Sequence, residues 1–91
     1  MKKLSVLIPA YNEEKTISAV LDKVLSVSLI NNITKEIIVI NDCSRDGTEN
    51  QILEYIKSHH EADIQYVKHE INQGKGAAIH SGIAKASGDY I

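Results

Sequence analysis

The chain has 91 residues, of which 43% are hydrophobic and 24% are charged, and its net charge is −2. Such a composition fits one small globular domain, which would bury only about 60–65% of the surface of its unfolded chain. It offers no basic surface for nucleic acid, and its aromatic residues, 4% of the chain and all tyrosine, are too few for a protein that stacks bases. The single cysteine, Cys43, excludes an internal disulfide and is typical of a cytoplasmic protein.

The first predicted strand is the apolar run Leu4–Ile8, which alternates too little to face water on either side. Pro9 is expected to end it, because proline has no N–H for a sheet ladder. A helix is predicted from about Glu14 to about Val27, with Asn12 as its N-cap. The strand would therefore deliver the turn after it to the carboxyl edge of a sheet, where ligands bind in open α/β proteins.

The same pattern then repeats twice. A second buried strand is predicted over Glu36–Ile40, and a third, weaker one over Ile64–Val67. The helix between them is expected to turn four residues inward: Ile52, Leu53, Tyr55 and Ile56. A third helix is predicted over Ala77–Ala86, and its inward face includes small residues that would allow close packing on the sheet: Ile79, Gly82, Ile83 and Ala86. Segment 28–34 is predicted to be a loop.

A fourth strand is predicted to begin at Tyr90 and Ile91, where the chain stops. The order βαβαβαβ predicts an α/β fold with a mostly parallel sheet and helices on both faces. A strand cut at this point would leave a sheet edge uncovered. We therefore expect residues 1–91 to be the N-terminal part of a longer domain, and we expect the isolated chain to self-associate or to be marginally stable.

Three turns would meet at the carboxyl edge of this sheet, over residues 9–14, 41–48 and 70–76. They bring together carboxylates, amides and one lysine: Glu13, Asp42, Asp46, Asn12, Asn41, Asn72, Gln73 and Lys75. Carboxylates at strand ends suit ribose hydroxyls or the N–H edge of a base, and a Gly-Lys-Gly turn that opens a helix suits phosphate. The sequence therefore predicts a nucleotide site, with the base near the first two turns and the phosphates toward the third.

Each of these residues also has a purely structural explanation. Glu13 would serve as a helix-start acid, Asp46 as a cap and Lys75 as a solvated loop residue. Cys43 is interpreted as a small turn residue. The histidines have no metal-ligand spacing and are interpreted as surface or helix residues: His59, His60, His69 and His80. A phosphate loop is excluded because no Ser or Thr follows the lysine, and a dinucleotide fingerprint is excluded because Ile79 occupies its third glycine position.

In this order and spacing, three motifs resemble the start of family 2 glycosyltransferases: VLIPAYNEE, VINDCSRDGT and NQGKGAAIHSGIAKASGDYI. Within that family they are most similar to the dolichyl- or polyprenyl-phosphate sugar synthases. The resemblance covers nearly the whole chain and implies the N-terminal part of a Rossmann-like, glycosyltransferase A fold. It also implies transfer of a sugar, with inversion, from a UDP- or GDP-sugar to polyprenyl phosphate or a saccharide, at the cytoplasmic face of the membrane.

The resemblance further implies roles for individual residues. Four residues would border the base and ribose of the donor: Pro9, Ala10, Tyr11 and Glu13. Asp42 would contact the base, and Lys75 would lie near the diphosphate. Asn41 and Cys43 depart from the Asp and Gly that similar proteins often carry. The family's Asp-x-Asp motif, which holds Mg²⁺ or Mn²⁺ on the diphosphate, would fall a few residues after Ile91, so no catalytic or metal-binding residue is expected in this chain.

Two other interpretations remain open. The chain would be a non-catalytic nucleotide-binding module, or an inactive truncated remnant, if the reading frame did not continue into an apolar strand and an Asp-x-Asp motif. A dinucleotide-dependent enzyme is disfavoured by the missing glycines.

Overall fold

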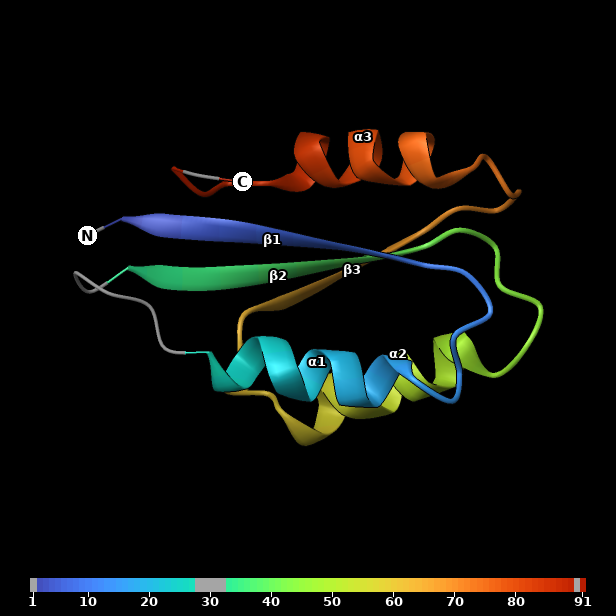
Figure 1. Ribbon diagram of the computed structural model, residues 1–91, viewed down its shortest axis with the longest axis horizontal. Helices are drawn as coiled ribbons and strands as arrows, with labels where there is room; N and C mark the ends of the chain where they lie inside the picture. Colours follow the sequence, from blue (N-terminus) through green and yellow to red (C-terminus); the bar gives the residue numbers. More distant parts are fainter. Residues whose placement is uncertain (1, 28–32, 90) are drawn as a thin grey trace.

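The computed structural model describes residues 2–27, 33–89 and 91. Strands and helices alternate along the chain (Figure 1): β1 Lys3–Ala10, α1 Ile17–Ser26, β2 Thr34–Asn41, α2 Thr48–Ser58, β3 Ile64–Lys68 and α3 Lys75–Lys85. The strands form one parallel sheet in the order β1-β2-β3. Helices α1 and α2 cover one face and α3 covers the other (Figure 1), so the predicted α/β fold with helices on both faces is confirmed.

β1 extends past the proline that was expected to end it, because Pro9 lies inside the strand. The carbonyl oxygen of Ala10 accepts a hydrogen bond from the Asp42 N–H at 2.9 Å, so the backbone groups of Ala10 face β2. Neighbouring residues of a strand turn these groups to opposite sides, so Pro9 faces the outer edge, where no N–H is required. The expected strand end was therefore wrong, since β1 is an edge strand of the described sheet.

α1 begins at Ile17, later than predicted, and Asn12 is not its N-cap. Asn12 has a φ of 53° and belongs to the turn that precedes the helix. At the other end of α1, the ammonium of Lys35 donates hydrogen bonds to the carbonyl oxygens of Val24 at 2.6 Å and Leu25 at 3.0 Å. These bonds satisfy the carbonyl groups that every helix leaves free in its last turn. Most of the predicted loop 28–34 lies outside the described residues.

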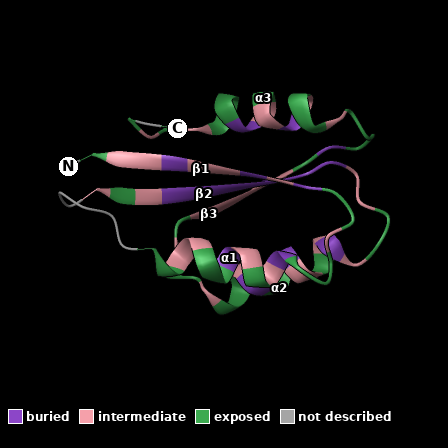
Figure 2. Ribbon diagram, in the orientation of Figure 1, coloured by how far each residue is buried: buried purple, intermediate pink, exposed green. Residues whose placement is uncertain are grey.

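β2 is the centre of the hydrophobic core, as its unbroken apolar run predicted (Figure 2). Ile37 and Val39 pack on the side of α1 and α2, while Ile38 and Ile40 pack against Ala78 of α3. Each such side chain contributes about 1.5–3 kcal/mol through burial. Burial on both faces of β2 therefore joins the two helical layers into one domain.

The inward faces of α2 and α3 are narrower than predicted. In α2 the buried residues Thr48, Ile52 and Tyr55 follow helical spacing, so Leu53 lies about 100° further around the axis and is exposed. In α3, Ile83 is exposed for the same reason, beside the buried Gly82. The expectations for Leu53 and Ile83 were therefore wrong.

The close packing expected at Gly82 is confirmed. A Cβ atom at this position would lie 2.9 Å from Cδ1 of Ile40 and 3.1 Å from Cδ2 of Leu7. A larger residue would require the Ile40 and Leu7 side chains to shift, so glycine lets the backbone of α3 lie directly on β1 and β2.

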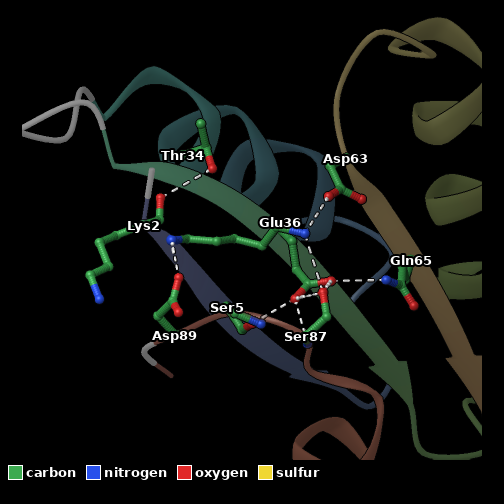
Figure 3. A network of polar contacts seen from close by, with 10 residues as sticks. Lys2, Ser5, Thr34, Glu36, Asp63, Gln65, Ser87 and Asp89 are labelled. Atoms are coloured by element: carbon green, nitrogen blue, oxygen red, sulfur yellow. Dashed lines mark hydrogen bonds and ion pairs between the residues drawn. The ribbon is translucent and has the colours of Figure 1, made fainter.

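A buried carboxylate joins the strands at the amino end of the sheet (Figure 3). Glu36 of β2 is 0% exposed and accepts hydrogen bonds from Ser5 Oγ at 2.6 Å, Gln65 Nε2 at 2.9 Å and the Ser87 N–H at 2.8 Å. Burial by itself would raise the pKa of Glu36, but the hydrogen bonds from Ser5 and Ser87 outweigh it and hold this pKa below its usual value. Glu36 therefore connects β1, β3 and the segment after α3.

That segment runs beside the outer edge of β1. The Asp89 N–H donates to the Lys3 carbonyl oxygen at 2.7 Å, the Lys3 N–H donates to Asp89 Oδ2 at 2.9 Å, and the Gly88 N–H donates to Ser5 Oγ at 2.9 Å. The chain thus reaches the place where a neighbour of β1 would start. The predicted fourth strand itself includes Tyr90, which lies outside the described residues.

Replacing Glu36 with glutamine should lower the free energy of unfolding by about 2 kcal/mol, because an amide NH₂ would face donors that now meet a carboxylate. Urea denaturation at neutral pH measures this change. Glu54→Gln, an exposed position in α2, is the matched control and should leave the stability unchanged.

The stability difference between wild type and Glu36→Gln should also depend on pH. A carboxylate whose pKa is lowered by folding stabilises the protein above its unfolded pKa, here 4.5, and this stabilisation is lost as the pH falls through the lower folded pKa. The difference should therefore begin to shrink as the pH falls below about 4.5 and should continue to shrink as the pH falls further, through the folded pKa. An unchanged difference at acid pH would contradict the assignment of Glu36 as a stabilising anion.

Candidate nucleotide-binding site

The turns that follow β1, β2 and β3 lie at the same end of the sheet, on the right in Figure 1. This arrangement follows from the parallel strand directions, and it confirms that the three predicted turns meet at the carboxyl edge. The contacts between the turns show which side chains maintain the frame of this edge and which line a cavity.

The first two turns are locked together by hydrogen bonds. The Asn12 N–H donates to Ser44 Oγ at 3.0 Å, and the Arg45 N–H donates to Asn12 Oδ1 at 2.8 Å. The Glu13 N–H donates to Thr48 Oγ1 at 2.7 Å. Asn12 thus joins two turns, which is a long-range role that the local cap pattern did not predict.

Asp46 has a structural role at the start of α2, which the sequence indicated as the alternative to ligand binding. Its Oδ1 accepts the N–H of Thr48, the first residue of α2, at 3.0 Å, and its Oδ2 accepts the Glu14 N–H at 3.3 Å. The hydrogen bonds from Thr48 are the main reason why the pKa of Asp46 lies below its usual value. Asp46 therefore accepts a hydrogen bond at the start of α2, as the structural interpretation expected, although the N-cap position itself is Gly47.

Asp42 joins the second turn to the third. Its carboxylate is 4% exposed; Oδ1 accepts the Gln73 N–H at 2.9 Å and lies 2.8 Å from His69 Nδ1, while Oδ2 accepts the Gly74 N–H at 2.8 Å. The Gln73 N–H is the main cause that lowers the pKa of Asp42, and together with His69 and Gly74 it outweighs the effect of burial. A carboxylate has about four acceptor positions, so one remains free, on Oδ2.

His69 is not the surface residue that the sequence suggested. It is 7% exposed, and its second ring nitrogen, Nε2, lies 2.8 Å from Ser81 Oγ in α3. His69 follows β3 in a turn that has no hydrophobic period, so nothing local marks it as buried. The other histidines agree with the prediction, since His60 and His80 are exposed and His59 stacks on Tyr55 at a ring-centroid distance of 3.9 Å.

A cavity of about 500 Å³ opens between the first and third turns, which is within the range of about 300–1,000 Å³ for small-ligand sites. All six residues predicted to bind a nucleotide line it, together with four others: Pro9, Ala10, Tyr11, Glu13, Asp42, Lys75, Asn72, Gly74, Ala78 and Ile79. Asn41 does not line it, because its buried amide is bound to the Tyr66 hydroxyl and the Ser44 N–H.

The third turn places a helix N-terminus at this cavity. Gly74 has a φ of 91°, which glycine adopts without strain, and its N–H also lies 3.1 Å from Asn72 Oδ1. α3 begins directly afterwards at Lys75, and the first N–H groups of a helix have no partner inside it. These N–H groups, the helix dipole and the ammonium of Lys75 together favour an anion.

The described part of the chain contains neither a metal-binding cluster nor a membrane-spanning helix. Within residues 2–27, 33–89 and 91, no group of three or more His, Cys, Asp or Glu side chains is placed to hold a metal ion. None of the helices in these same ranges is both long and apolar enough to cross a bilayer.

The cavity combines an apolar wall, carboxylates and a helix start that favours anions. These features suit a nucleoside that carries phosphates.

The hydrogen bonds from the Gln73 and Gly74 N–H groups to Asp42 should be lost in an acid titration. Because the folded pKa of Asp42 lies below 3.8, its hold on the Gln73 and Gly74 N–H groups should persist above that pH and be lost as the pH falls further. The amide shifts of these two residues, followed by proton–nitrogen NMR, should change with one midpoint below the usual value. Asp42→Asn should abolish this transition, whereas a midpoint above 4 would contradict the assignment.

Comparisons with known proteins agree on one family. The sequence model described as Glycosyl transferase family 2 matches residues 5–91. A poly-β-1,6-N-acetyl-D-glucosamine synthase from Staphylococcus epidermidis is 41% identical over 88 residues, covering 97% of this chain and 20% of that protein. The human dolichyl-phosphate β-glucosyltransferase is 34% identical over 95 residues, covering 99% of this chain and 29% of that protein. The chain thus spans less than a third of these relatives.

Solved structures share the fold. A mannosyltransferase from Pyrobaculum calidifontis, in complex with GDP-Man and Mn²⁺, has a TM-score of 0.88 at 24% identity, covering 97% of this chain and 25% of that one. A glucosyl-3-phosphoglycerate synthase from Mycobacterium tuberculosis, in complex with Mn²⁺ and UDP-glucose, has a TM-score of 0.68 at 28% identity, covering 97% of this chain and 30% of that one. The fold expected from the resemblance is therefore confirmed.

Proposed function

This chain belongs to glycosyltransferase family 2, and from that premise we propose that residues 1–91 form the donor-nucleotide half-site of a glycosyltransferase domain. The domain would transfer a sugar from a UDP- or GDP-sugar to polyprenyl phosphate or a saccharide. One observation carries the proposal: all six predicted nucleotide-binding residues, drawn from three separate turns, line one cavity.

The nucleoside is assigned to the first turn. Tyr11 is exposed at the cavity, so its ring is free to stack on a base, and Pro9 and Ala10 form the apolar wall beside it. Glu13 offers carboxylate oxygens to ribose hydroxyls. Asp42 has one acceptor position free, which suits a single N–H of a base.

The diphosphate is assigned to the third turn. Gly74 and Lys75 line the cavity where α3 begins, so the N–H groups of the helix and the ammonium group both favour negative charge at this point. The acidic first turn and the Lys75 ammonium at the start of α3 would thus orient the donor, with its base toward β1 and its phosphates toward α3.

The proposed reaction is an inverting displacement, in which an acceptor oxygen attacks the anomeric carbon of the donor and the nucleoside diphosphate leaves. A polyprenyl phosphate is already an anion and needs little help from a base, whereas a sugar hydroxyl needs one. No described residue is assigned a catalytic role. The described residues also do not fit a Mg²⁺ or Mn²⁺ site, so no step is assigned to a metal here.

A non-catalytic nucleotide-binding module is the second candidate, because it would use the same cavity and the same six lining residues. It shares the nucleotide site and differs only in lacking transfer. An assay for release of nucleoside diphosphate from the protein with its whole reading frame separates the two candidates.

The first test is a titration of the chain with UDP and then GDP, in the presence of Mg²⁺, followed by amide proton–nitrogen NMR. Shifts should be confined to the neighbourhoods of Tyr11, Glu13, Asp42 and Lys75, and the tighter ligand identifies the base. A well-dispersed spectrum that neither nucleotide changes would overturn the nucleotide site.

The second test concerns the diphosphate. Lys75→Ala should weaken UDP or GDP binding about 5- to 20-fold, as expected for the loss of a charged hydrogen bond, and should leave UMP or GMP binding nearly unchanged. Lys57→Ala, an exposed position in α2, is the matched control. Equal losses for monophosphate and diphosphate would contradict the assignment of Lys75 to the diphosphate.

A further inference from the structure

Asp42, His69 and Ser81 form a continuous chain of polar contacts from the end of β2 to the middle of α3. His69 Nδ1 lies 2.8 Å from Asp42 Oδ1, and His69 Nε2 lies 2.8 Å from Ser81 Oγ. An ionised carboxylate only accepts hydrogen bonds, so Nδ1 carries a proton, and in the neutral ring Nε2 accepts the Ser81 hydroxyl. Both ring nitrogens are thus occupied by protein groups.

The order of these groups is that of a hydrolytic serine triad, so a nucleophilic serine has to be considered. Ser81 lies in the interior of α3, where the backbone N–H groups are bonded within the helix and cannot stabilise an oxyanion. Ser81 is also absent from the residues that line the cavity. The geometry therefore favours a positioning role over a nucleophilic one.

The Asp42 carboxylate is connected to two places, the third turn and the middle of α3. It binds the start of α3 directly, through the Gln73 and Gly74 N–H groups, and it binds Ser81 through the ring of His69. Lys75 lies between these anchors along the chain. The rotation of the carboxylate, the tilt of the imidazole and the position of α3 are therefore coupled, and a change in one displaces the others.

We propose that His69 and Ser81 are positioning residues, which orient the Asp42 carboxylate so that it holds the Gln73–Lys75 turn in the conformation that binds the diphosphate. This inference rests on the proposed function, because it assigns the turn to the diphosphate. It assigns a supporting role to His69 and Ser81, neither of which would touch the donor. It also means that Asp42 holds the turn in place in addition to offering one free acceptor position to a ligand.

The test uses four variants of the chain. His69→Phe removes both ring contacts, His69→Asn keeps a donor near the Nδ1 position, and Ser81→Ala removes only the outer contact. His80→Phe is the matched control, because His80 is exposed and lies next to Ser81 in α3. Slow amide exchange in β2, for example at Ile38, verifies that each variant is folded.

Amide hydrogen exchange is the first measurement, and it requires no ligand. His69→Phe should speed exchange of the Gln73 and Gly74 amides about tenfold or more, as expected when a charged, buried hydrogen-bond network loses a member. His69→Asn and Ser81→Ala should have smaller effects, and His80→Phe none. Exchange within twofold of wild type in folded His69→Phe would overturn the proposal.

The second measurement compares nucleotides. His69→Phe should reduce the preference for UDP over UMP, or for GDP over GMP, about fivefold, whereas general destabilisation would weaken both ligands equally. A preference equal to that of wild type would overturn the link between His69 and the diphosphate. If the wild-type chain bound neither UDP nor GDP, the proposed function would fail, while the exchange measurement would still decide whether His69 holds the turn.

Discussion

The carboxylate of Asp42 is the interaction on which the carboxyl edge of the sheet depends. It lies on the face of β2 that α3 covers, and its oxygens bind two backbone N–H groups of the third turn and one histidine ring. Such an anion is stable under burial only because several donors replace water. The conformation of the Gly-Lys-Gly turn is therefore set from β2, and not by the turn alone.

Glu36 is the counterpart of Asp42 at the opposite end of β2. Asp42 comes six positions after Glu36, an even number, so both side chains point to the same face of the strand. Asp42 holds the chain just before α3, at Gly74, and Glu36 holds it just after α3, at Ser87. The buried face of α3 consists of small residues, which bury little apolar area. Two charged hydrogen-bond networks at its ends therefore supply the attachment that larger apolar side chains supply to α1 and α2.

The elements that the sequence predicted best are those whose signal is local. Unbroken apolar runs identified β1 and β2, and turn residues at the strand ends identified the edge where the cavity lies. Leu53 and Ile83 were misplaced around the axes of correctly predicted helices, but the other errors concern residues whose partners are far along the chain. Pro9 was expected to end β1, but it lies inside the strand because β1 is an edge strand of the described sheet. Asn12 was assigned to a nearby helix, although its partners are Ser44 and Arg45. His69 has no periodic pattern that marks it as buried, and the buried strand predicted over Glu36–Ile40 did not indicate which donors Glu36 would meet.

The residues that line the cavity also differ in how many of their side-chain groups are already bound by the protein. Tyr11 and Lys75 are exposed, so their side chains are free for a ligand, whereas Asp42 has most of its acceptor positions occupied by the protein. A resemblance in sequence assigns all three to the nucleotide without distinguishing these situations. In the proposed site, ligand contacts would therefore come mainly from the first and third turns, and the second turn would supply the frame that sets the distance between them. If the proposed site is correct, a change at a residue that does not line the cavity, such as His69, would alter donor binding through the position of Lys75.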